Sequence, residues 1–149
     1  MYRLILASHN FFRWIVVIVA VLALVRVYLG LFGNREWTRR DHSISTFFAV
    51  SLDIQFLLGI ILYIFLSPLT TPIFENFGAA MQDAAIRFFA LEHFLYMLAA
   101  LVLVHIGNSR ARRAAESKGK YRTLAIFYSL AVLFIVLGMP WSRPLIRGF

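Results

Sequence analysis

Four long apolar runs constrain the fold of this chain more than any other feature. The runs cover about residues 8–32, 42–66, 83–106 and 121–139. A helix needs about 20 apolar residues to cross the hydrocarbon core of a bilayer, and each run is near that length. Inside lipid the backbone must satisfy its own hydrogen bonds, which helices do within one segment. The sequence therefore predicts an all-α integral membrane protein.

Polar connections between the runs predict where the helices end. They are short, which favours antiparallel neighbours in a four-helix bundle. No composition shift or low-complexity tract divides residues 1–149, so we expect a single domain. The expected boundary signals are Gly33 and Asn34 after the first run, Asp41 or Ser43 as the cap of the second, SPLTTP (67–72) after it, GNSR (107–110) after the third and Pro140 after the fourth.

Basic residues predict the orientation of the chain in the membrane. The loops after the first and third runs together hold nine basic residues: Arg35, Arg39, Arg40, Arg110, Arg112, Arg113, Lys118, Lys120 and Arg122. Because cytoplasmic loops carry an excess of Lys and Arg, both loops should be cytoplasmic, with the N- and C-termini outside. The net charge of +8 fits basic loops beside membrane lipids, and no basic-aromatic motif supports nucleic-acid binding.

Cysteine is absent from the sequence, and this restricts the possible cofactors. Disulfides, iron–sulfur clusters, thiolate-ligated haem and covalently attached c-type haem are all excluded. The sequence also has no phosphate-binding glycine loop, nucleophile elbow or zinc signature. No catalytic residue is predicted. We therefore expect an electron-transfer subunit rather than a stand-alone enzyme.

Ionisable side chains inside the apolar runs are the candidate functional residues, because they are costly there and usually face the bundle interior. In the first run, His9 and Arg13 are four residues apart and share one helix face. In the third run, Glu92 and His93 are adjacent and point about 100° apart. The other polar residues inside the runs are Arg26, Asp53, Gln55, Arg87 and His105.

Two pairs of histidines lie at similar predicted depths. His9 is seventeen residues from Arg26, or about 25 Å, and His93 is fourteen residues from Gly107, or about 21 Å. The first and third helices both start outside, so this pair should meet in the outer half of the bundle. A second and weaker candidate pair, His42 and His105, lies near the inner interface.

Haem with two axial histidines suits these residues chemically. Neutral imidazole is a ligand of haem iron, and its second ring nitrogen needs a hydrogen-bonding partner. Asp53, Gln55, Glu92 or a backbone carbonyl could supply that partner, and Arg13 and Arg87 could bind the propionates. Other interpretations stay open: a polar clasp that holds the helices together with no cofactor, a chlorophyll-type pigment on histidine, or a quinone.

Four stretches of the sequence resemble a family. HNFFRWIV (9–16), LDIQFLLGIILYI (52–64), IRFFALEHFLYML (86–98) and MPWSRP (139–144) are similar to small bacterial four-span proteins labelled cytochrome b or cytochrome b561-like. The resemblance implies haem b inside a four-helix bundle of the bacterial inner membrane. It singles out His9, Arg13, Gln55, Arg87, Glu92 and His93, and it does not support His42 or His105. Asp53 stands where the family pattern also accommodates histidine, which favours one outer haem, or none, over two.

Together these features predict a b-type haem protein that passes electrons within a larger quinone-linked redox or photosynthetic assembly. The proposed axial ligands are His9 and His93. The expected partners are membrane lipids, other membrane subunits and a quinone. The alternative is a cofactor-free accessory subunit that docks a larger complex through its helices.

Overall fold

The structure is a computed structural model that describes residues 1–141, and those residues are helical apart from short connections. Its elements are α1 (Tyr2–Phe32), α2 (Arg39–Ile61), the π-helix η1 (Leu62–Leu66), the 3₁₀-helix η2 (Thr71–Phe74), α3 (Phe77–Gln82), α4 (Ala84–Arg87), the π-helix η3 (Phe88–Glu92), α5 (His93–Arg113) and α6 (Ser117–Gly138). The predicted all-α fold is confirmed.

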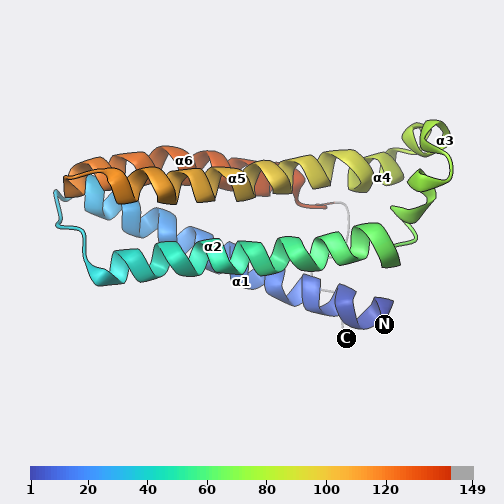
Figure 1. The fold of residues 1–149 in the computed structure, drawn as a ribbon, viewed down its shortest axis with the longest axis horizontal. Helices are drawn as coiled ribbons and strands as arrows, with labels where there is room; N and C mark the ends of the chain where they lie inside the picture. Colours follow the sequence, from blue (N-terminus) through green and yellow to red (C-terminus); the bar gives the residue numbers. More distant parts are fainter. Residues whose placement is uncertain (142–149) are drawn as a thin grey trace.

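Four long helical segments form an antiparallel bundle (Figure 1). Helix α1 packs against α2 and α6, and α5 packs against α6 and α2, which closes the ring. The connections 33–38 and 114–116 share one end, called here the two-loop end. The other end, called the α3 end, carries the N-terminus and the short helices between α2 and α5 (Figure 1). All four segments are long and apolar enough to cross a membrane: Tyr2–Phe32, Arg39–Leu66, Ala84–Arg113 and Ser117–Gly138.

Small and aromatic side chains fill the centre of the bundle. Ala23, Ala100 and Ala131 are at most 1% exposed, so they allow the helices to approach closely. Between them, the buried rings of Phe48 and Tyr128 meet edge to face at 5.1 Å. Because lipid is as apolar as these residues, close packing and hydrogen bonds hold the helices together more than the hydrophobic effect does.

A polar clasp joins α1 and α2 at the two-loop end. The Arg26 Nε donates to Asp41 Oδ1 at 2.7 Å, and the Thr38 backbone N–H donates to Asp41 Oδ2 at 2.8 Å. Thr38 is the N-cap of α2 and Asp41 is the third residue of the helix, which together form a capping box. The expectation that Asp41 or Ser43 would be the N-cap is therefore wrong by a few residues. The helix starts earlier because Asp41 bonds back to Thr38.

The helix ends differ from the predicted ones mainly at the start of the first segment, where α1 begins at Tyr2 instead of about residue 8, and at the end of the third. Helix α5 continues through Asn108 to Arg113 instead of ending at GNSR. It continues because Asn108 is buried and bonded to both neighbouring helices: its Nδ2 donates to the Ser45 carbonyl at 3.2 Å, and its Oδ1 accepts from Tyr128 Oη at 2.6 Å. The first, second and fourth segments end at or near the predicted signals. After Phe32, Asn34 adopts a positive φ of 46°, a conformation that asparagine tolerates better than most residues.

The connection at the α3 end contains two short helices that were not predicted, η2 and α3, whereas α4 lies at the predicted start of the third run. Helices α3 and α4 are short, and each is capped by the side chain of the preceding residue: Asn76 Oδ1 accepts from Ala79 N, and Asp83 Oδ1 accepts from the N–H groups of Ala85 and Ile86. The second half of the MPWSRP stretch, residues 142–144, lies outside the described residues.

Candidate functional site

A cavity of about 210 Å³ lies inside the bundle toward the α3 end, and it is called here the histidine cavity. All four long helical segments contribute to its wall. The polar or aromatic lining residues are Tyr2, His9, Asn10, Arg13, Gln55, Phe56, Tyr63, Ser67, Thr70, Phe89, His93 and Phe94. Two glycines, Gly59 and Gly138, and the apolar residues Leu52 and Met97 also line it.

His9 and His93 both line this cavity and lie beside each other. Their ring centroids are 6.4 Å apart and the ring planes are inclined by 70°. The two residues belong to different helices and are far apart in the sequence, yet they meet at the predicted depth. Two metal–nitrogen bonds of about 2 Å each, in line with the two ring radii, would separate the centroids by about 6 Å. A direct edge-to-face contact between rings also falls in this range.

The hydrogen bond of His93 fixes which of its nitrogens could bind a metal. The His93 Nδ1 lies 2.7 Å from the carbonyl oxygen of Gly138 at the end of α6. Because a carbonyl only accepts, Nδ1 carries the proton and Nε2 keeps its lone pair. Metal-ligating histidines usually donate their other ring N–H to an acceptor of this kind, which orients the ring. His93 therefore has the arrangement of a ligand.

His9 and Gln55 leave two buried polar atoms without a hydrogen-bond partner among residues 1–141. The Gln55 Nε2 lies 3.2 Å from His9 Nε2, whereas Gln55 Oε1 and His9 Nδ1 have no partner. Gln55 is only 7% exposed. Buried polar groups are nearly always satisfied, so the unsatisfied pair indicates that the cavity holds a further molecule. Gly59 lies against this imidazole: a Cβ at its position would be 3.3 Å from His9 Cε1.

Two π-helical turns shape the wall of the cavity. The segment η1 contributes Leu62 and Tyr63, and the facing segment η3 contributes Phe89. The Tyr63 hydroxyl donates to the Ala90 carbonyl at 2.8 Å, which ties the two turns together. One extra residue in a turn rotates the following helix by about 100°. π-Turns often occur at functional sites, and nothing in the sequence predicted these two.

The structure places only one of the three charged residues expected around the cofactor at the histidine cavity. Arg13 is half-buried and lines the histidine cavity, as the shared face with His9 predicts. Arg87 and Glu92 do not line it. They form an exposed ion pair at 3.3 Å on the outside of the bundle, with Arg87 just before η3 and Glu92 at its end. Arg13 is thus the predicted propionate partner that the structure places at the site.

The second candidate pair, His42 and His105, lies at a separate cavity of about 410 Å³ near the two-loop end. His105 Nε2 is 2.7 Å from Asp53 Oδ1, so this nitrogen is engaged by a carboxylate. His42 lines the same cavity, and the structure gives no ring contact between the two histidines among the described residues. Within those residues there is also no group of three or more His, Asp or Glu side chains that could hold a metal ion by themselves.

The donor set of the histidine cavity fits a b-type haem, whereas its volume is small. Two imidazoles lie beside each other, a carbonyl orients one of them, and an arginine lies nearby for an anionic group. At about 210 Å³ the cavity is below the roughly 300–1,000 Å³ of ordinary ligand pockets. A macrocycle would therefore require lining side chains such as Phe89 and Phe94 to swing outward.

Comparison with protein families, with curated proteins and with solved structures finds no match to this chain. The fold and the site are those of a four-helix bundle with helices long enough to span a membrane and a largely apolar cavity lined by two histidines.

Proposed function

We propose that the protein binds a b-type haem in the histidine cavity and passes electrons within the membrane. The observation that carries this proposal is the buried, unsatisfied His9–Gln55 pair beside His93 in the histidine cavity. A polar clasp alone would be expected to satisfy its own buried atoms, because an unsatisfied buried group costs about 1–3 kcal/mol.

In this proposal each residue has a distinct role. His93 would bind through Nε2, with its ring held in place by the Gly138 carbonyl, and His9 would bind through Nδ1. Gln55, with its amide turned over, would orient the His9 ring by accepting the Nε2–H with Oε1, and Arg13 would neutralise a propionate. The bound haem would supply a reversible one-electron couple, and the aromatic wall formed by Phe56, Phe89 and Phe94 would exclude water from it.

The wider setting is proposed from the charge pattern and from the resemblance to bacterial cytochromes. The chain would lie in a bacterial inner membrane with both termini outside, so that the histidine cavity is nearer the outer surface. It would act as a small subunit of a larger redox assembly and exchange electrons with a quinone. Many large apolar side chains on the bundle surface are exposed, among them Phe11, Phe47 and Leu57. They leave wide areas for lipid or for partner helices.

The test is the absorbance of the purified protein produced with haem supplied. A Soret band, with a b-type band in the reduced-minus-oxidised spectrum at about one haem per chain, is the expected result. A pigment with magnesium would give a different spectrum, and no Soret band at all would leave the accessory-subunit interpretation in its place. In that case loss of His9 or His93 would affect only stability or assembly.

A further inference from the structure

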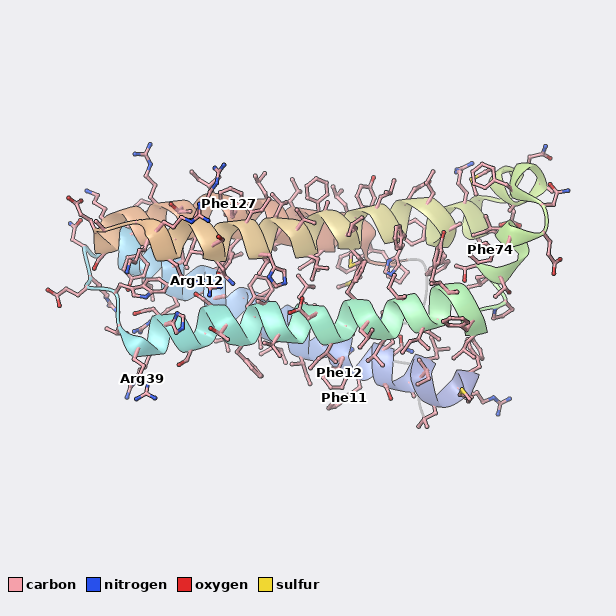
Figure 2. The ribbon with its side chains drawn as sticks, viewed as in Figure 1. Phe11, Phe12, Arg39, Phe74, Arg112 and Phe127 are labelled. Atoms are coloured by element: carbon pink, nitrogen blue, oxygen red, sulfur yellow. The ribbon has the colours of Figure 1, made fainter. Side chains whose placement is uncertain are left out.

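The larger cavity, near the two-loop end, is not explained by haem binding in the histidine cavity. It lies between α2 and α5 and reaches α6, and it is called here the Asp53 groove. Its lining is mostly polar: Trp37, His42, Ser45, Thr46, Asp53, His105, Asn108, Arg112 and Lys120, with Ala49, Val50, Ala111 and Leu124. Figure 2 shows Arg112 beside the space between the α2 and α5 ribbons, whereas Arg39 projects outward from the start of α2.

The hydrogen-bonded pair of Asp53 and His105 lies within the apolar spans and is open at its surface. Asp53 is fourteen residues, or about 21 Å, from the start of α2 at Arg39. The two side chains are joined at 2.7 Å and are 45% and 50% exposed. Ionisable groups at such depth are costly and mark sites of ion or proton transfer when they face a polar cavity. A molecule dissolved in the bilayer can therefore reach this pair from the side.

The pair has the chemistry of a proton acceptor. The Asp53 carboxylate accepts the Nε2–H of His105, which leaves the lone pair on His105 Nδ1. A carboxylate in this position fixes the tautomer of the imidazole and stabilises the imidazolium that forms when Nδ1 takes a proton. The arrangement suits a ligand that releases a proton from a hydroxyl group.

The Asp53 groove lies nearer the two-loop end than the histidine cavity does. On α2, Ala49, Val50 and Asp53 line the groove, and Leu52, Gln55 and Phe56 line the histidine cavity. Along α5, His105 follows His93 by twelve residues, or about 18 Å of helix axis. A molecule in the groove would therefore lie on the two-loop side of the proposed haem.

From these observations we infer that the Asp53 groove binds the ring of a membrane-soluble quinol, with His105 as proton acceptor and Asp53 as the residue that positions it. This inference rests on the proposed haem function, because it names where that haem exchanges electrons. His105 Nδ1 would take the two hydroxyl protons in turn, both O–H bonds would break, and the product would be the quinone. The proposed haem, when bound, would supply the one-electron couple through which the two electrons pass singly to a one-electron acceptor, a redox-active metal centre of the partner assembly.

Other polar and charged groups line the groove beside the pair. They are Arg112 on α5, Lys120 on α6 and His42 on α2. In this proposal each proton leaves His105 past these groups to water at the two-loop end. In the orientation proposed above, this is the cytoplasmic side.

The experiment uses haem-loaded wild type and four variants. His105→Gln removes the base, Asp53→Asn removes the carboxylate, and Val50→Phe obstructs the groove without touching the pair. The matched control is Tyr28→Phe, which breaks another exposed hydrogen bond between helices, that of Tyr28 with Ser129 at 2.8 Å. For each protein, stopped-flow absorbance follows haem reduction by a short-chain ubiquinol or menaquinol, and re-oxidation of dithionite-reduced protein by the matching quinone.

We expect all variants to show the wild-type spectrum with dithionite. With quinol, His105→Gln should be slower by about 100-fold or more, the range of general-base catalysis, and Asp53→Asn and Val50→Phe by about tenfold or more. Tyr28→Phe should react at the wild-type rate. Wild-type rates in His105→Gln and Val50→Phe would overturn the inference, even if Asp53→Asn fails to fold.

The failure of the haem proposal is distinguishable from the failure of this inference. If dithionite produces no haem band in the wild type, the proposed function fails. The groove is then tested by the thermal stability of the wild type with and without short-chain quinone. Stabilisation that disappears in Val50→Phe and in His105→Gln supports the binding site, and the absence of any stabilisation overturns it.

Discussion

Replacing Asn108 by Leu should weaken the bundle through two identifiable hydrogen bonds. Asn108 is 7% exposed and joins α5 to α6 through Tyr128 Oη, at 2.6 Å, and to α2 through the Ser45 carbonyl, at 3.2 Å. Leucine has the same number and branching of side-chain heavy atoms and makes neither bond. The Tyr128 hydroxyl, in a residue that is 0% exposed, then keeps only the Ser45 side chain as a hydrogen-bonding partner. A hydrogen bond contributes about 0.5–1.5 kcal/mol net, so the loss of the two bonds should destabilise the fold by about 1–3 kcal/mol.

A double-mutant cycle with Tyr128→Phe isolates the bond between Asn108 and Tyr128. In the wild type, Tyr128→Phe should cost about 1 kcal/mol, because it leaves Asn108 Oδ1 unsatisfied. In the Asn108→Leu background it should cost less than in the wild type, since the bond to Asn108 is already absent. The expected coupling is about 0.6–1.7 kcal/mol, the range for hydrogen bonds between membrane helices. Reversible unfolding in mixed micelles measures it, and equal effects of Tyr128→Phe in both backgrounds would refute the argument.

Two further predictions concern orientation and the site. Ala115→Cys, in the connection before α6, should react with an impermeant thiol reagent only from the cytoplasmic side, and Glu75→Cys only from outside; the reverse pattern would invert the proposed topology. Gly59→Ala places a Cβ 3.3 Å from His9 Cε1, so it should weaken haem retention. The control Gly119→Ala, whose Cβ would lie 3.5 Å from Ala114, should not affect haem, and equal haem content in both variants would contradict the assigned position of His9.

The fold could be predicted from the sequence because the length and hydropathy of the four apolar runs are compatible with few structures in lipid. Four runs of spanning length with short connections permit little besides an antiparallel bundle. Counting residues from the helix ends also placed His9 and His93 at one level, because rise per residue is constant in a helix. Gln55 was named as a possible partner of an imidazole, and the structure places it beside His9.

Other features of the sites could not be predicted from residue spacing. Arg87 and Glu92 precede α5 through the π-turn η3, which changes the helix register, and the sequence carries no signal for such a turn. The Asp53–His105 bond depends on how α2 is rotated against α5. Apolar residues on nearly every face of these helices leave that rotation undetermined by periodicity.

The most direct test of the account is the axial ligation of the haem in single histidine variants. Electron paramagnetic resonance and absorbance of the oxidised wild type should show a low-spin haem with two histidine ligands. His93→Ala should lose the haem, and His9→Ala should bind it weakly and without the low-spin signature, while His42→Ala and His105→Ala keep the wild-type spectrum. If His93→Ala and His9→Ala retain that spectrum, or if His42→Ala and His105→Ala lose a haem signal of their own, the assignment of the haem to the histidine cavity is contradicted.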